Sequence, residues 1–274
     1  MKKTIRYISL SILGFLFLIP FLWMTVSSLK PQSAIFADAF PLRWQAFWVS
    51  EPTFEHYIKV FTAVPFARYL LNTLLISISV AFGSLLVGSL AAYSFARLRF
   101  PGRDILFMAV LSTMIIPGEV TFMPLFMVIR SLGWIDSYAA LIVPPLFGAF
   151  GIFLLRQFFR DMPRDLEDSA RIDGCSVLGI YRHITIPLAK SALITLGLLS
   201  FMGEWGSFLW PLVVMNSPEK QVIQVGIANF TTTYGIYWGR ILAGSAMATI
   251  PVIVLFMALQ RYYVRGITMT GLKG

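Results

Sequence analysis

Charged residues are scarce in this chain of 274 residues. Asp, Glu, Lys and Arg make up only 13% of the sequence, whereas soluble domains contain roughly 25%. Hydrophobic residues make up 57%, and the mean hydropathy is +0.76. This composition excludes an ordinary water-soluble domain and predicts an all-α membrane protein.

Groups that carry out chemistry are also scarce. The single cysteine, Cys175, excludes an intrachain disulfide, and no zinc-binding spacing occurs. The two histidines, His56 and His183, fall on opposite sides of the membrane in the topology that the hydrophobic runs predict. The sequence has no H-E-x-x-H motif and no phosphate-binding G-x-x-x-x-G-K-[ST] motif. We therefore predict a protein that is not an enzyme and has no metal site or cofactor of its own.

Hydrophobic runs long enough to cross a bilayer recur along the chain. The six expected spans cover residues 7–28, 69–93, 105–129, 139–158, 188–210 and 241–259. A cleaved signal peptide has a shorter apolar core and ends at a small-residue cleavage site, so the first run is interpreted as a retained helix. Fifteen of the 22 basic residues fall on one side of this layout. The positive-inside rule then places both termini in the cytoplasm.

Small residues recur every fourth position in the second expected span, at Ser84, Gly88 and Ala92. Such a face allows two helices to approach closely in lipid. We expect the second span to pack against a neighbouring helix through this face.

Proline and glycine interrupt the third expected span, where Pro117, Gly118, Glu119 and Pro124 occur within eight residues. Irregular backbone at membrane depth is tolerated only beside protein or a water-filled cavity. The break is therefore a candidate for the outer part of a transport pathway. The alternative is a helix that ends at Ile116 and is followed by an external re-entry.

Glu204 is the clearest ionisable residue inside an expected span, within the sequence FMGEWGSFLWP. An intramembrane carboxylate is a functional hypothesis by default. Trp205 and Phe208 lie beside it, and aromatic rings with a few polar groups are how proteins hold sugars and polyols. Glu204, Trp205, Phe208 and Glu119 are therefore candidate substrate-pathway residues. The alternatives are bundle packing for Glu204 and an interfacial aromatic belt for the tryptophans, Trp210 above all.

The most polar stretch of the chain, residues 164–187, connects the fourth and fifth expected spans. Pro163 suits the first position of a helix, and the acidic residues after it suit the first turns. Gly174 fits a left-handed C-cap, and Ser176 can cap a second helix. We expect two short helices, the second with an apolar stripe at Val177, Leu178, Tyr181 and Ile184. A solvated loop and a docking element for a partner both fit this pattern.

Short motifs in this connector resemble the EAA loop of the permease subunits of bacterial ABC importers. The family pattern is roughly E-A-A-x-x-D-G-A, followed after a spacer by a hydrophobic residue and proline. The matching residues are Asp168-Ser169-Ala170, Asp173-Gly174-Cys175 and Ile186-Pro187, and Glu167 resembles the extra acid of some members. The chain departs from the pattern with Asp for Glu, Ser for Ala and Cys for Ala.

The resemblance extends over nearly the whole chain and is strongest to the carbohydrate-uptake branch. That branch includes the smaller maltose permease and the glycerol-3-phosphate permease. The similar segments are SLK, NTLLIS, SFARLRFPG, FLWPLVV and RYYVRGITMTGLKG. Where the family often has Trp-Asn-Glu-Phe, this chain has Trp205-Gly206-Ser207-Phe208, so a substrate contact there does not carry over from the family pattern.

The resemblance implies a multi-pass permease of a bacterial cell membrane that imports a sugar or related polyol. Its implied partners are a second permease chain, two ATPase subunits that bind ATP and Mg²⁺, and an extracytoplasmic solute-binding protein, with no nucleic acid. The implied ATPase-coupling residues are Glu167, Asp168, Ser169, Ala170, Asp173, Gly174, Ile186 and Pro187.

The resemblance also predicts how the chain is divided. Residues 1–66 would form the first transmembrane helix and an external segment. Residues 67–262 would form the permease domain, a five-helix core that carries the EAA loop at 161–187. Residues 263–274 would form a cytoplasmic tail.

The alternative functions are import of glycerol-3-phosphate or another small solute, and a self-contained secondary carrier.

Overall fold

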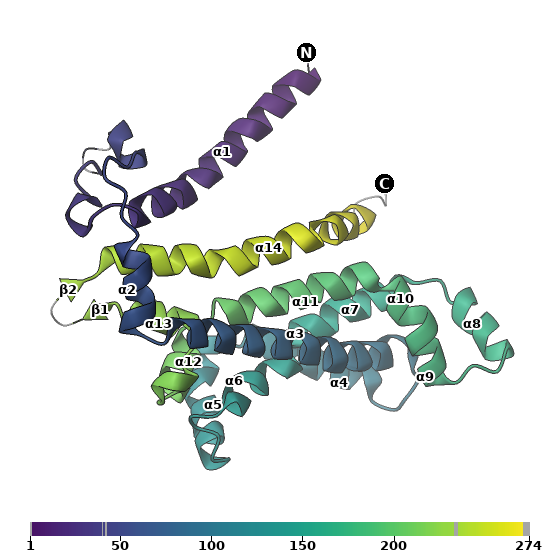
Figure 1. The fold of residues 1–274 in the computed structure, drawn as a ribbon. Helices are drawn as coiled ribbons and strands as arrows, with labels where there is room; N and C mark the ends of the chain where they lie inside the picture. Colours follow the sequence, from purple (N-terminus) through teal and green to yellow (C-terminus); the bar gives the residue numbers. More distant parts are fainter. Residues whose placement is uncertain (1, 40, 42, 233–234, 271–274) are drawn as a thin grey trace. The chain divides into compact units, whose positions relative to one another are not determined.

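The computed structural model describes residues 2–39, 41, 43–232 and 235–270 (Figure 1), with side chains between residues 3 and 260. This part of the chain is mostly helical, and its two strands, β1 (Thr231–Thr232) and β2 (Gly235–Ile236), form one short antiparallel hairpin. The all-α class predicted from composition is therefore confirmed.

Four helical segments of the described chain are long and apolar enough to cross a membrane. They are α1 (Lys2–Ser28), α3 (Phe66–Arg97), the stretch Tyr138–Asp161 that contains α6 (Tyr138–Ile142) and α7 (Ala149–Asp161), and α14 (Trp238–Thr270). Two bent helix pairs raise the number to six if each pair is one span. The six expected spans match this upper number.

The two bends occur where the sequence carries helix-breaking residues. Arg103–Ile115 and α5 (Gly118–Ser131) meet at 105° around Pro117, as the sequence predicted for the third span. Val177–Leu188 and α11 (Lys190–Trp205) meet at 79° after Pro187.

The predicted end of the fifth span was wrong. We expected a helix as far as Trp210, but α11 ends at Trp205 and α12 (Leu209–Val214) begins a new turn. Gly206 caps α11 through its backbone N–H, and Pro211 follows within α12. Glycine and proline at these positions favour the end of one helix and the start of another over a continuous span.

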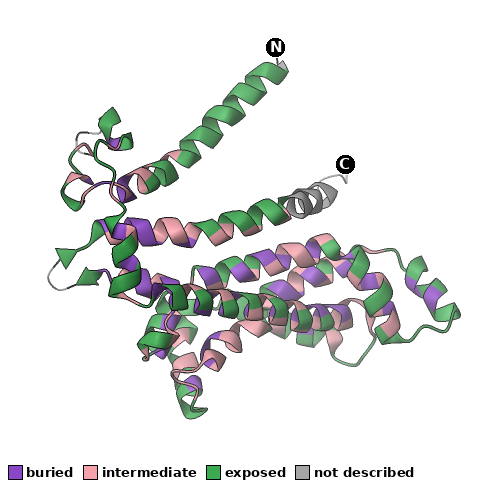
Figure 2. Cartoon of the chain, viewed as in Figure 1, coloured by how far each residue is buried: buried purple, intermediate pink, exposed green. Residues whose placement is uncertain are grey.

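The chain forms two compact units, and the first comprises residues 1–70 and 221–254. Its core joins α2 (Glu55–Ala63), the start of α3, α13 (Ile223–Ala228) and α14. The buried members are Val60, Phe66, Ile223, Ile227, Phe230, Ala243 and Ala248. Helix α2 lies within residues 1–66, where the sequence predicted a first transmembrane helix and an external segment. The apolar window of α1 has no buried residue within the chain (Figure 2), as expected of a surface that faces lipid.

Two buried polar side chains hold the segment between α1 and α2 in place. The Lys30 ammonium donates hydrogen bonds of 3.0 Å to the carbonyl oxygens of both Gln45 and Ala46. His56 Nε2 lies 2.9 Å from the carbonyl oxygen of Lys30. A Cβ at Gly239 would lie 2.3 Å from the His56 ring, so the glycine there lets α14 approach α2 closely. These contacts fix the segment that the sequence left without a predicted arrangement.

The second unit comprises residues 71–220 and 255–274, of which 255–270 are described. Helices α3, α7 and α11 run side by side in it (Figure 1), and α4 (Arg103–Ser112) lies against α7. Its buried core consists of Ala92, Tyr93, Phe107, Ile152, Leu155, Phe159, Ala189, Ala192 and Leu196. A Cβ at Gly151 would lie 3.0 Å from Leu196, and one at Gly88 would lie 3.8 Å from the same side chain. The predicted small-residue face of α3 therefore packs against α11 through Gly88 and the fully buried Ala92, whereas the tighter contact with Leu196 is made by Gly151 of α7.

One carboxylate organises the loops between α5 and α6 and after α12. Asp136 has a positive φ of 58°. Its Oδ1 accepts hydrogen bonds from the backbone N–H groups of Asn216 and Ser217 at 3.0 and 2.9 Å. Its Oδ2 accepts from the Ser217 hydroxyl and lies 3.1 Å from the Lys220 ammonium. Donors from Ser217, then Lys220 and Asn216, hold the pKa of the Asp136 carboxyl well below its ordinary value.

We expect Asp136→Asn to lower the stability of the second unit at neutral pH by about 1 kcal/mol, the value of a charge-assisted hydrogen bond at a partly exposed site. The lowered pKa stabilises the folded state above the ordinary Asp pKa of about 3.9, and this contribution is lost as pH falls through the lowered value. Thermal unfolding of the detergent-solubilised protein should therefore separate wild type and variant at pH 7 and bring them together in acid. Asp161→Asn removes an exposed carboxylate and serves as the control. A pH-independent difference between wild type and Asp136→Asn would contradict the prediction.

Candidate functional site

The polar connector folds as a pair of short helices at one end of the second unit. It contains α8 (Asp165–Ile172) and α9 (Val177–Ile180), as the sequence predicted. In Figure 1 these helices lie at the opposite end of the α3, α7 and α11 bundle from α5 and α12. The sequence predicted Pro163 at the first helical position. In the structure the helix begins at Asp165 with Arg164 as N-cap, so Pro163 lies outside the helix.

The break between α8 and α9 is a Schellman turn. Gly174 has a φ of +80°. Its N–H donates to the carbonyl of Arg171 at 3.0 Å, and the N–H of Cys175 donates to the carbonyl of Ala170 at 2.9 Å. These two bonds and the left-handed residue define the motif. Ser176 then accepts a hydrogen bond from the Gly179 N–H at 3.1 Å, which confirms the predicted cap of the second helix.

The apolar stripe expected on the second helix was wrong at its first two positions. Val177 and Leu178 are exposed, whereas Ile180 and Thr185 are buried. A π-helical turn at Tyr181–Thr185 follows α9 and leads into α10 (Ile186–Leu188). Its extra residue per turn shifts the buried face away from the register of a regular helix.

Tyr181 anchors this segment to α3. Its hydroxyl lies 2.7 Å from the hydroxyl of Ser89, and its ring centroid lies 5.2 Å from that of Tyr93. Ile186 and Pro187 lie in α10, just before the 79° bend into α11. The second helix therefore connects the exposed Gly174 turn directly to the core of the bundle.

A buried ion pair joins α8 to the end of α3. Arg97 Nε lies 3.0 Å from Glu167 Oε1, and the two side chains are only 2% and 5% exposed. Arg97 also donates to the carbonyl of Met162 at 2.8 Å. On the solvent side, Arg171 lies 3.6 Å from Glu167 and 2.7 Å from Asp168. This buried charge pair therefore holds α8 against the end of α3.

The outer surface of the connector combines polar and apolar side chains. Asp168, Ser169 and Asp173 are exposed, whereas Ala170 and Glu167 are buried. Exposed apolar side chains lie beside these polar residues, namely Leu166, Ile172 at 88% exposure, Val177 and Leu178. Contiguous exposed apolar groups rimmed by polar ones are typical of interaction sites. Sequence reasoning missed Ile172, although an isoleucine within an otherwise polar stretch was the available signal.

The candidate substrate residues lie apart from this connector. Glu204 is half-buried in the last turn of α11, and Trp205 beside it is buried and stacks on Phe201 with ring centroids 5.4 Å apart. Phe208 is exposed before α12, and Glu119 is exposed in the first turn of α5. Within the described residues, no hydrogen bond or ion pair links the side chains of Glu119 and Glu204.

Trp210 is bound into the fold. Its Nε1–H donates to the carbonyl of Ala140 at 2.9 Å, and its ring lies edge-on to Phe122 with centroids 5.3 Å apart. This side chain therefore joins α12 to α6 and α5.

A cavity that the sequence did not reveal lies between α3, α11 and the break before α7. It has a volume of about 220 Å³ and is lined by residues that include Ser84, Pro145, Gly151 and Ser200. The two consecutive prolines at positions 144 and 145 interrupt the helix there. Such a break at membrane depth is tolerated beside a cavity.

Comparison with known proteins identifies the family. The family described as binding-protein-dependent transport system inner membrane component matches residues 84–269. The chain belongs to this family. The permease is 34% identical to the arabinooligosaccharides transport system permease protein AraQ of Bacillus subtilis (strain 168), over 96% of this chain and 92% of that protein. It is 30% identical to the sulfoquinovosyl glycerol transport system permease protein SmoH of Agrobacterium fabrum, over 99% and 94%.

A third relative is the sn-glycerol-3-phosphate transport system permease protein UgpE of Yersinia pestis bv. Antiqua (strain Antiqua), 32% identical over 75% of this permease and 74% of that protein. Among solved structures, a bacterial ABC transporter involved in the import of the polysaccharide alginate superposes with a TM-score of 0.80 at 24% identity, over 95% of this chain and 96% of that one. At this identity the superposition shows that the fold is shared. Proteins of the family are membrane components of importers and not enzymes in themselves, as predicted.

Proposed function

We propose that this permease imports a sugar or related polyol as one subunit of an ATP-driven complex. A second permease chain, two ATPase subunits that bind ATP and Mg²⁺, and an extracytoplasmic solute-binding protein complete the complex. A related alginate transporter has been solved with a periplasmic protein that carries an alginate pentasaccharide. The named substrates of similar permeases, which include arabino-oligosaccharides, lactose and glycerol-3-phosphate, support the substrate class.

The observation that carries the proposal is the surface of the α8–α9 connector. Leu166 and Ile172 of α8 and Leu178 of α9 are exposed on the two helices that meet at the Gly174 turn. The buried Arg97–Glu167 pair ties the same element to α3. A partner that binds this surface and moves would tilt the bundle. We propose that this partner is an ATPase subunit, with Asp168, Ser169, Ala170, Asp173 and Gly174 at or near the contact.

The orientation follows from the distribution of charge. In the proposed topology six spans cross the membrane of the cell, both termini are cytoplasmic, and α8 and α9 lie on the cytoplasmic side. The end of the bundle with α5, α12 and the half-buried Glu204 then faces outward, where a loaded binding protein would deliver solute. Glu119, Glu204, Trp205 and Phe208 remain candidates for the pathway there.

The decisive test is solute-stimulated ATP hydrolysis by the reconstituted complex. The permease would be purified with the subunits that remain bound to it and assayed with its binding protein. The panel should contain an arabino-oligosaccharide, lactose, a sulfoquinovosyl glycerol and sn-glycerol-3-phosphate. We expect one of these solutes to stimulate hydrolysis and uptake. Uptake by the isolated permease without ATP would instead indicate a secondary carrier, and co-purification without any ATPase would contradict the proposal.

A further inference from the structure

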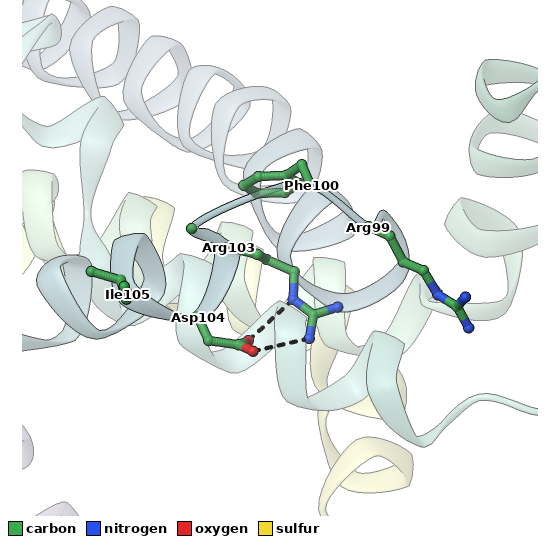
Figure 3. A pocket seen from close by; sticks show the side chains of 6 residues that line it. Arg99, Phe100, Arg103, Asp104 and Ile105 are labelled. Atoms are coloured by element: carbon green, nitrogen blue, oxygen red, sulfur yellow. Dashed lines mark hydrogen bonds and ion pairs between the residues drawn. The ribbon is translucent and has the colours of Figure 1, made fainter.

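A second cluster of charge lies at the loop between α3 and α4, next to the α8 end of the connector. It surrounds a pocket of about 500 Å³ lined by Arg99, Phe100, Gly102, Arg103, Asp104 and Ile105 (Figure 3). Within it, Arg103 Nε and the carboxylate of Asp104 approach to 3.1 Å, and Arg103 also donates to the carbonyl of Leu98. In Figure 3 the guanidinium of Arg99 extends away from this pair.

Positive charge exceeds negative charge at this pocket. Asp104 also lies 3.9 Å from the guanidinium of Arg156, so two arginines share one carboxylate. Arg156 is held by a carbonyl of α3 and stacks over the Phe107 ring at 3.8 Å. Arg99 is exposed and forms no hydrogen bond or ion pair with any residue of the described chain. Arg99 also lines a neighbouring pocket with the connector residues Arg164, Glu167, Asp168 and Arg171. Its solvent-accessible guanidinium has no direct ion-pair partner there among the described residues and suits a phosphate group.

An exposed apolar surface begins at the same pocket. Ile105, which lines it, is 77% exposed. Met108 and Ile115 continue along the same side of the segment and are also exposed. The spacing of these residues places them on one helical face. A cationic pocket that opens onto an apolar helix face matches a molecule with an anionic head and a hydrocarbon tail.

We propose that this pocket binds the headgroup of an anionic phospholipid, whose acyl chains lie along the exposed face of α4. Basic pockets beside transmembrane helices on the cytoplasmic side bind such headgroups. The inference rests on one element of the proposed topology, namely that the α3–α4 loop lies at the cytoplasmic surface of the membrane. A free phosphate ion would satisfy Arg99 but would leave the apolar face unused, so the structure favours the lipid.

The test is lipid binding by the detergent-solubilised complex, measured by native mass spectrometry. The complex would be titrated with phosphatidylglycerol, with phosphatidylcholine as the lipid without net charge, and with inorganic phosphate as a competitor. We expect a phosphatidylglycerol to be retained in preference to phosphatidylcholine and to resist displacement by equimolar phosphate. Equal retention of the two lipids, or displacement by phosphate, would overturn the proposal. This comparison uses the wild-type chain and depends on no variant.

Variants of Arg99 locate the site. Because a basic residue near a membrane surface contributes about fivefold to anionic lipid binding, Arg99→Gln should weaken phosphatidylglycerol binding about fivefold and Arg99→Glu roughly 25-fold. Arg99→Lys should retain binding. Arg130→Gln removes another exposed arginine, at the end of α5, and should have no effect. Unchanged binding in Arg99→Glu would refute the assignment, and would leave the proposed import function untouched because transport does not enter the measurement.

Discussion

Replacing Glu167 with alanine should destabilise the attachment of α8 by about 3–5 kcal/mol, the usual effect of removing one partner of a buried ion pair. Arg97 would remain buried without a counter-charge, and only its hydrogen bond to Met162 would stay. The large penalty falls on one short helix, so we expect local detachment of α8 and not global unfolding. Hydrogen exchange of residues 165–172 should accelerate, and ATP-driven uptake should be lost while the chain still inserts.

Two further variants test whether Glu167 acts by holding α8 to α3 or by contacting the partner subunit directly. Asp165→Ala removes an exposed acid from the same first turn and should cost less than about 1 kcal/mol. The double variant Arg97→Met, Glu167→Met replaces both charges by apolar groups, a change that is often neutral for a buried pair. If Glu167 acts by holding α8 to α3, the double variant regains slow exchange and uptake. If slow exchange returns without uptake, Glu167 itself contacts the partner, and its attachment of α8 to α3 does not explain its role in uptake.

Gly174→Val should abolish ATP-driven uptake, because no β-branched residue adopts a φ of +80° readily. The left-handed conformation costs an ordinary L-residue roughly 1–2 kcal/mol, and more when Cβ is branched. The α8–α9 turn would then rearrange and move the exposed Ile172 and Leu178 relative to each other. Uptake into proteoliposomes and retention of the ATPase during purification measure the effect.

Gly174→Asn provides the matched control for this change. Asparagine tolerates the left-handed region, and a Cβ at position 174 meets no atom within 4 Å in the described chain. If the conformation of the turn is what matters, Asn should retain most uptake, Ala should be intermediate and Val inactive. Equal loss in Asn and Val would instead mean that the partner closes directly on the glycine. Full uptake in the Val variant would remove the turn from the coupling mechanism.

Local signals in the sequence predicted the elements that depend on neighbouring residues. Gly174 and Ser176 identified the break and the cap of the connector, and Pro117 identified the bend between α4 and α5. Each of these is a backbone preference that acts over a few residues. The predicted apolar stripe failed at Val177 and Leu178, which are exposed. The segment is held to α3 through Tyr181, in the π-helical turn that follows α9.

Contacts between distant segments were outside the reach of the sequence. The Arg97–Glu167 pair joins residues 70 positions apart. The motif resemblance implied a coupling role for Glu167, but it predicted neither the burial of this side chain nor its pairing with Arg97. Asp136 likewise draws in Ser217 and Lys220 from another loop. The sequence does not indicate whether a charged residue is solvated or buried, so its ion-pair partner cannot be inferred from spacing.

The sequence by itself determined the membrane class, the approximate runs of the spans, the family and the position of the connector, because hydropathy and turn preferences are properties of short stretches. The tertiary structure decided which acid of the connector is buried, which apolar side chains remain for a partner, and where Arg99 meets an exposed apolar face. Those outcomes depend on how helices pack, since burial and charge pairing arise only when segments far apart in the chain come together.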